Sequence, residues 1–236
     1  MQTIEELKEV KQALSEKTVL FEQIDDTILN TQQILQETEK TLQTLASELA
    51  SSRKKVIPKL TEELTFTLDA LGISSPIIEI DLNTSNTYHQ FGNENLQFLF
   101  SANKGQVAKP LKQAASGGEL SRVMLSIKAI LARYQKLPTI IFDEIDTGVS
   151  GEIATKMATL MHDMSKHMQL LSITHLPQIA ARGDGHFKVF KEDDQDKTIT
   201  KLVSLNQDER VVEIAEMLGG KQLSTSALEH AKQLLN

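Results

Sequence analysis

Ala115-Ser-Gly-Gly-Glu-Leu-Ser-Arg122 combines a helix start with room for a ligand. Ser116 and Glu119 have the spacing of a reciprocal capping box, so we expect a helix to begin here. Gly117 and Gly118 lie inside that box, where the absence of side chains leaves backbone N–H groups open to close approach. Such a helix N-terminus suits a phosphate, although an ordinary capped helix would have the same pattern.

Downstream, two short apolar runs each end in residues with chemical uses. Residues 138–144 end in Asp143 and Glu144, and residues 170–175 end in His175. A helix is expected between the runs, and a strand–helix–strand order implies a right-handed crossover and a parallel strand pair. Because ligands bind beyond the carboxyl ends of such strands, the two acids and the histidine should converge on one edge of the sheet.

These residue types would support phosphate chemistry. Adjacent carboxylates at a strand end point in different directions, so one can hold a magnesium ion while the other orients or deprotonates an attacking water. His175 could contact a terminal phosphate or that water through its imidazole. Taken singly, an acid pair is often only the cap of the next helix, and a lone histidine is often only a satisfied polar residue. The three motifs in this order are more specific than any one of them.

The N-terminal segment, up to about Arg53, has the pattern of a long coiled-coil helix. One heptad position is apolar throughout: Leu7, Leu14, Phe21, Ile28, Leu35, Leu42 and Leu49. The companion position is mixed, and no proline or glycine occurs before Pro58. A seven-residue register held over so many turns favours a coiled coil over a single long helix packed on a core. The chain has no second segment of this kind, so the partner helix is expected from another copy or from protein outside these residues.

Local patterns predict the remaining elements. Pro58 is expected to kink the helix, which would continue to Gly72. Alternating apolar residues predict strands within residues 78–82 and 96–100, with the polar residues 83–95 as a hairpin connection or a loop. Further helices are predicted at about residues 120–135, 152–166, 209–218 and 225–235, further strands at 186–191 and 198–204, and a loop at 105–115.

The composition sets limits on function. The 236 residues include 40% hydrophobic and 24% charged residues but no cysteine, which excludes disulfides and thiolate metal sites. No apolar run approaches a membrane span and no signal peptide is evident, so a cytoplasmic location is the default expectation. The net charge of −7 argues against a protein that coats nucleic acid generally. Lys104, Lys109, Lys112 and Arg122 are only weak candidates for DNA contacts.

Taken in order, the motifs resemble those of ATP-binding-cassette (ABC) ATPases. Residues 116–119 are similar to the signature motif, and residues 140–144 look like the Walker B strand. Asp146 falls in the loop that follows, the D-loop, and His175 matches the switch histidine. A terminal coiled coil joined to such a head resembles the structural-maintenance-of-chromosomes (SMC) group.

Within that group, the amino-acid sequences of five segments are similar to those of the bacterial RecN family of DNA-repair proteins. They are residues 115–122, 142–151, 174–180, 216–220 and 227–232. The resemblance implies an α/β fold, namely the C-terminal lobe of an ABC/SMC-type P-loop ATPase head with parallel core strands after a long coiled-coil helix. It also implies two parts, a coiled-coil arm over residues 1–57 and the ATPase lobe over residues 58–236.

The resemblance further implies roles for single residues. Asp143 would support Mg²⁺, Glu144 would act as the base or position the water, and His175 would sense the γ-phosphate of ATP. Asp146 would help to couple two active sites across an interface. The signature residues Ser116, Gly117, Gly118 and Glu119 would meet ATP held on the opposing head of a homodimer.

The family's phosphate-binding loop, of the form Gly-x-x-x-x-Gly-Lys-Ser/Thr, does not occur in these residues. The chain is therefore interpreted as a C-terminal fragment that, alone, would bind ATP poorly and hydrolyse almost none. In the complete protein, ATP would close two heads and hydrolysis would release them. The resemblance implies that this protein acts on DNA in the nucleoid, during recombinational repair of double-strand breaks. The alternatives are another chromosome-associated ATPase, a transporter ATPase, or a non-catalytic coiled-coil interaction module.

Overall fold

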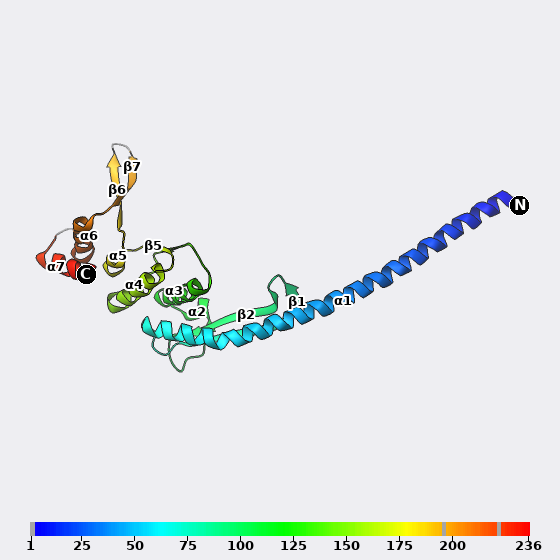
Figure 1. Cartoon of the computed structure of the whole chain (residues 1–236), viewed down its shortest axis with the longest axis horizontal. Helices are drawn as coiled ribbons and strands as arrows, with labels where there is room; N and C mark the ends of the chain where they lie inside the picture. The colour runs from blue at the N-terminus through cyan, green and yellow to red at the C-terminus, as the bar shows by residue number, and fades with distance from the viewer. Residues whose placement is uncertain (1–2, 195–196, 221–222) are drawn as a thin grey trace. The chain divides into compact units, whose positions relative to one another are not determined.

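The computed structural model describes residues 3–194, 197–220 and 223–236, coloured along the chain in Figure 1. It divides into two compact units, Met1–Val56 with Leu82–Asn95, and Ile57–Asp81 with Leu96–Asn236. Helix α1 (Ile4–Ala70) and strands β1 (Ile77–His89) and β2 (Gly92–Ser101) contribute to both units. The later elements are β3 (Lys109–Pro110), α2 (Leu111–Ala114), α3 (Gly117–Tyr134), β4 (Thr139–Asp143), α4 (Gly151–Ser165), β5 (Gln169–Ile173), α5 (Pro177–Arg182), β6 (Phe187–Asp194), β7 (Lys197–Ser204), α6 (Gln207–Gly219) and α7 (Thr225–Leu235).

Helix α1 continues through Pro58 and stops at a glycine. It is 67 residues long, with Pro58 inside it. At its end Ile73 N–H donates to Leu68 O and Gly72 N–H donates to Asp69 O, both at 2.9 Å. These two bonds form a Schellman motif, which requires a left-handed residue, and Gly72 has φ 81°. The predicted end of the helix is confirmed because glycine adopts this conformation without steric cost.

In the first unit, the predicted heptad row lies exposed along α1. The exposed fractions of its seven side chains run from 37% for Leu49 to 65% for Phe21. Ala46, by contrast, is buried. The helix therefore presents a continuous apolar stripe of the kind that forms one side of a coiled coil.

The polar residues 83–95, expected as a connection or a loop, are mostly strand. β1 runs to His89 and β2 begins at Gly92, so the turn occupies only two residues. The loop interpretation was wrong because this hairpin has no buried apolar face in that region, and polar side chains conceal the alternation that marks a half-buried strand.

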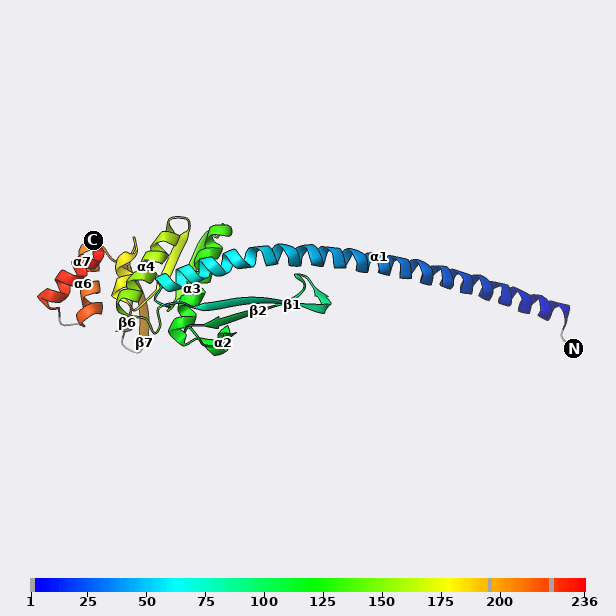
Figure 2. The same cartoon turned by 90° about the horizontal axis from the view of Figure 1, so that it is seen from below.

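The hairpin tip lies beside α1 (Figure 2), and an ion pair between Arg53 and the buried Glu94 carboxylate joins the two elements. Arg53 Nη1 donates to Glu94 Oε2 at 2.9 Å, and Arg53 Nη2 donates to Phe91 O at 2.7 Å. The Glu94 side chain is only 2% exposed. A bidentate guanidinium that bridges a carboxylate and a backbone carbonyl holds the two elements in a fixed register.

In the second unit, α3 lies between two hydrophobic clusters. Leu125 and Ala129 belong to one cluster, whose other buried residues include Leu71, Phe142, Val149, Ala154, Met157, Ala158, Met161, Met164 and Ile179. Val123 and Ile130 belong to the other, with Leu64, Leu68, Ile73, Ile78 and Phe100. The end of α1, the base of the β1–β2 hairpin and α4 are thus all packed around the helix that begins at the glycine-rich run.

The predicted strand–helix–strand unit is confirmed. β4 and β5 are parallel, Asp143 is paired with Ile173 in the ladder, and α4 lies between the strands in the sequence. Phe142 is buried on one face of the pair, whereas Ile141 and Ile173 are 63% and 58% exposed on the other. Parallel sheets usually have both faces covered, so the second face is unusually open.

The C-terminal part contains a third, smaller cluster formed by α5, α6 and α7. Helix α5, which was not predicted, is only six residues long. Its end is fixed by Arg210 of α6, whose Nη2 donates to Gly183 O at 2.6 Å and to Ala181 O at 3.3 Å. β6 and β7 pair as the predicted antiparallel hairpin.

Candidate nucleotide site at the carboxyl ends of β4 and β5

The glycine-rich run forms the N-terminus of α3. Ser116 is the N-cap, and its N–H donates to Glu119 Oε2 at 2.8 Å in the predicted capping box. The first helical hydrogen bond joins Leu120 N–H to Ser116 O at 2.8 Å. Ser116 and Gly117 are exposed, whereas the Glu119 carboxylate is occupied in closing the box. The accessible part of this tip is therefore the serine hydroxyl and the glycine backbone.

Gly118 packs against the loop that follows β4. A Cβ added at Gly118 would lie 2.9 Å from Gly148 O, closer than real Cβ atoms approach. Gly148 has φ 75°, so it too depends on the absence of a side chain. At Gly117, by contrast, an added Cβ would meet nothing within 4 Å. One glycine of the pair thus joins two segments about thirty residues apart in the sequence, and the other faces outward.

The two acids at the end of β4 are both exposed, but their backbones differ. Glu144 has φ 48°, in the left-handed region that residues with a side chain rarely adopt. Its N–H donates to Ile173 O at 3.1 Å. Its carbonyl accepts from the N–H of Thr147 at 3.2 Å and from the Thr147 hydroxyl at 2.9 Å. Since strain of this kind persists only where the surroundings impose it, these three bonds hold the Glu144 backbone in its left-handed conformation.

Asp146 is placed differently from the other acids. Its side chain is fully buried, and its Oδ2 accepts a hydrogen bond from the Thr174 hydroxyl. The same hydroxyl accepts from Leu176 N–H at 2.9 Å. Asp146 Oδ2 also lies 3.9 Å from Nδ1 of His175, whose ring is 64% exposed. The residue that the resemblance placed at an interface between two heads therefore faces the end of β5 in its own chain.

Together these contacts bring the predicted residues to one place. Asp143, Glu144 and Asp146 follow β4, His175 follows the adjacent β5, and the α3 tip touches the loop after β4 through Gly118. Sequence reasoning missed Thr174, which links the two strand ends. A hydroxyl residue directly before the histidine was the only signal that could have indicated it.

The strand end offers few protein ligands for a cation. Within residues 3–194, 197–220 and 223–236, no cluster of three or more His, Cys, Asp or Glu side chains could hold a metal by itself. This fits Mg²⁺, which is usually held by one or two carboxylates together with substrate phosphates and water, and does not fit an all-protein metal cage. Asp143, exposed at the strand end, could provide that ligand.

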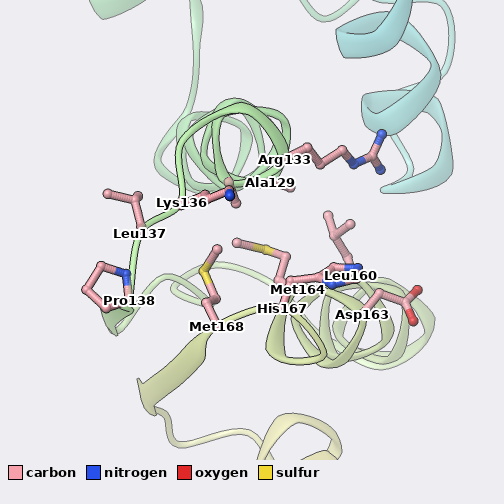
Figure 3. A pocket seen from close by; sticks show the side chains of 11 residues that line it. Ala129, Arg133, Lys136, Leu137, Pro138, Leu160, Asp163, Met164, His167 and Met168 are labelled. Atoms are coloured by element: carbon pink, nitrogen blue, oxygen red, sulfur yellow. The ribbon is translucent and has the colours of Figure 1, made fainter.

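A cavity lies at the opposite edge of these strands. A cavity of about 680 Å³ lies between the C-terminal ends of α3 and α4 and is lined by residues such as Lys136, Pro138, Met164 and Met168. Figure 3 shows Met164 and Met168 beside this space. Pro138 and Met168 immediately precede β4 and β5, so the cavity is at the amino ends of the strands, opposite the candidate site. Ligands of parallel sheets bind at the carboxyl ends, which makes this cavity the weaker candidate.

Comparison with curated proteins decides the family. The chain is 35% identical over 216 residues to the DNA repair protein RecN of Halalkalibacterium halodurans, covering 90% of this chain and 38% of that protein. It is 33% identical to RecN of Bacillus subtilis over 99% of this chain and 43% of that protein. It is 45% identical to RecN of Treponema pallidum over 61% of this chain and 25% of that protein.

Over the length it spans, the chain belongs to the RecN family. It spans less than half the length of each of these RecN relatives. No family model matches the sequence. The expected resemblance to RecN is thus confirmed by identity along most of the chain.

Solved structures show that this RecN-family chain has the SMC head fold. The Smc head domain with a coiled coil and joint from Pyrococcus yayanosii matches 97% of this chain and 38% of its own with a TM-score of 0.56 at 19% identity. The Smc head domain with an extended coiled coil bound to the C-terminal domain of ScpA, from Pyrococcus furiosus, matches 91% of this chain and 55% of its own with a TM-score of 0.51 at 19% identity. The predicted α/β class, with a long helix and a parallel strand pair, is therefore confirmed. Among the described residues, no helix is long and apolar enough to cross a membrane.

Proposed function

We propose that this RecN-family chain contributes the signature tip, the acidic strand end and the switch histidine of an ATPase that acts in recombinational repair of DNA double-strand breaks. The observation that carries the proposal is the physical connection of the three motifs. The α3 tip touches the loop after β4 through Gly118 and Gly148, and that loop is tied to the end of β5 through Asp146 and Thr174. Three motifs that occur together by chance would not converge in this way.

The acidic strand end would carry out the hydrolytic step. Asp143 would bind Mg²⁺ together with the ATP phosphates. Glu144, whose backbone is constrained at the end of the strand, would position or deprotonate the attacking water. His175 would contact the γ-phosphate through its exposed ring. The bound Mg²⁺ would neutralise charge that develops on the phosphates.

The signature tip would act on a second head. Ser116 and Gly117 are exposed, and space beside Gly117 is open to an incoming group. A helix N-terminus with free N–H groups and a hydroxyl is suited to the γ-phosphate of ATP bound by the opposite head of a homodimer. Gly118 and Glu119 would support the tip from within, because one packs on Gly148 and the other closes the cap.

The phosphate-binding loop would come from a lobe outside these residues. The exposed apolar face of the β4–β5 pair is suited to packing against such a lobe. Residues 1–57 would form the coiled-coil arm and residues 58–236 the lobe. ATP would join two heads, hydrolysis would separate them, and the arms would pass this change to DNA in the nucleoid.

A single substitution tests the catalytic part of this proposal. The chain is joined to the N-terminal lobe of Bacillus subtilis RecN, and ATP hydrolysis is compared between the wild type and Glu144→Gln. Loss of the base should slow hydrolysis by about 10²- to 10⁴-fold while ATP binding is retained. Equal rates in the two proteins would remove Glu144 from this role. The unfused chain should show almost no turnover, and a rate equal to that of the fusion would contradict the need for a second lobe.

A second candidate function rests on the exposed heptad row of α1. On its own, the chain could serve as a coiled-coil interaction module without catalysis. Sedimentation of the unfused chain distinguishes the ATPase from the interaction module. A stable association without nucleotide would favour the module if it were lost when Leu14 and Phe21 were replaced by Asn.

A further inference from the structure

Asp146 has an environment that neither loop geometry nor surface exposure explains. Its carboxylate is fully buried, and Oδ1 has no hydrogen-bond partner among the described residues. Only the Thr174 hydroxyl is bonded to Oδ2. Removing a carboxylate from water is unfavourable unless the charge is paired and hydrogen-bonded. A neutral residue such as asparagine could accept the same bond from Thr174 at lower cost, so the negative charge needs another reason.

The only cationic or ionisable nitrogen recorded within 4 Å of this carboxylate, among the described residues, is Nδ1 of His175, at 3.9 Å from Oδ2. That distance is too long for a direct hydrogen bond. The ring is exposed enough to rotate, however, and bonds that support catalysis are often long before a ligand arrives. Thr174 holds the carboxylate in place by donating to it while accepting from Leu176 N–H.

We propose that Asp146 is a positioning residue, whose carboxylate holds the His175 imidazole through Nδ1–H and leaves Nε2 as the nitrogen offered to a ligand. Which nitrogen of a histidine carries the proton is set by the hydrogen bond that the other makes. A buried carboxylate beside Nδ1 stabilises the Nδ1–H form and fixes the plane of the ring. The biological purpose assigned to this arrangement, contact of Nε2 with the γ-phosphate, rests on the function proposed above.

The same contacts would keep the base and the histidine in register. Asp146 lies two residues beyond Glu144 in a turn, and Asp146 O accepts from Val149 N–H at 3.1 Å. Its side chain is bonded to Thr174 at the end of the neighbouring strand. Displacing this carboxylate would therefore loosen the turn that carries Glu144 and the ring of His175 together, although neither residue would be altered.

The first test needs no nucleotide. Imidazole ¹⁵N NMR spectra of the 236-residue chain are recorded at a pH well above the ordinary histidine pKa of about 6.5, and His175→Gln identifies the signal among the six histidines. We expect His175 to be mainly the Nδ1–H tautomer in the wild type. In Asp146→Asn, whose amide can donate to Nδ1, we expect mainly the Nε2–H tautomer. An Nε2–H tautomer in the wild type would overturn the proposal even if the variant did not fold.

A control separates the effect of the Asp146 charge from that of the Thr174–Asp146 hydrogen bond, which links the ends of β4 and β5. Thr174→Val removes the hydroxyl and keeps Asp146, so His175 should remain Nδ1–H. If Thr174→Val and Asp146→Asn changed the tautomer equally, the Thr174–Asp146 hydrogen bond alone would explain the tautomer of His175, and the proposal would fail.

A second test uses the fusion with the RecN N-terminal lobe. Asp146→Asn should lower kcat about 10- to 100-fold, by analogy with carboxylates that orient metal-binding histidines, with little change in KM. An unchanged kcat, or a loss entirely in KM, would overturn the positioning role. The two hypotheses fail separately: if Glu144→Gln did not slow hydrolysis while His175 was still Nδ1–H, the proposed function would be wrong but the geometry would stand.

Discussion

Gly118→Ala is the substitution whose effect the structure defines most closely. The added methyl group would lie 2.9 Å from Gly148 O and 3.6 Å from Thr147 O, and both atoms belong to the backbone. Because a carbonyl in a tight turn cannot rotate away as a flexible side chain can, the α3 tip and the loop after β4 must move apart. Overpacking of this kind typically costs about 1–3 kcal/mol.

Gly117→Ala is the matched control. The same methyl group, one position earlier in the same helix, meets nothing within 4 Å. Alanine also restricts the unfolded chain more than glycine, so this variant should be neutral or more stable by up to about 1 kcal/mol. Urea unfolding of the chain, followed by far-ultraviolet circular dichroism, measures both. Equal midpoints for Gly118→Ala and Gly117→Ala would show that the α3 tip and the loop after β4 are not in contact at Gly118.

Three further perturbations have expected outcomes. Glu144→Gly should raise the free energy of unfolding by about 1 kcal/mol, because glycine adopts φ 48° without steric cost. Glu144→Gln keeps the strained backbone and should not raise it. The urea midpoints of the two variants measure the difference. Arg53→Met should leave the buried Glu94 carboxylate unpaired and destabilise the hairpin by about 1–3 kcal/mol. The expected result is faster hydrogen exchange in residues 82–95, and unchanged exchange would contradict this prediction. Burial, and then the nearby Arg210 guanidinium, lower the pKa of His186. Its folded pKa is thus below its unfolded value of about 6.5, so stability is fully present above that pH and is lost as pH falls; His186→Gln should flatten this dependence.

Local signals predicted the parts of this molecule that depend on few neighbours. The capping box at Ser116 and Glu119 is complete within four residues, so the helix start could be predicted from the sequence alone. The parallel strands at residues 139–143 and 169–173 were equally clear, because a short buried run followed by a helix permits few arrangements.

The features that the sequence did not reveal depend on contacts between distant residues. Residues 83–95 form strands held by Arg53 of a helix about forty residues earlier, a contact that no local alternation reveals. The burial of Asp146 against Thr174 also depends on the pairing of β4 with β5. A sequence shows that an aspartate follows a strand, but only the fold determines whether its carboxylate faces solvent, a partner or its own histidine.

In the proposed ATPase, each active site is shared, with Glu144 on one head and the Ser116 tip on the other. The most direct measurement mixes two inactive fusion proteins, Glu144→Gln and Ser116→Arg, and records ATP hydrolysis. A mixed dimer would contain one site with both residues intact, so random mixing should restore about one quarter of the wild-type rate. Activity no higher than that of either variant alone, in a mixture shown to form mixed dimers, would contradict the shared site.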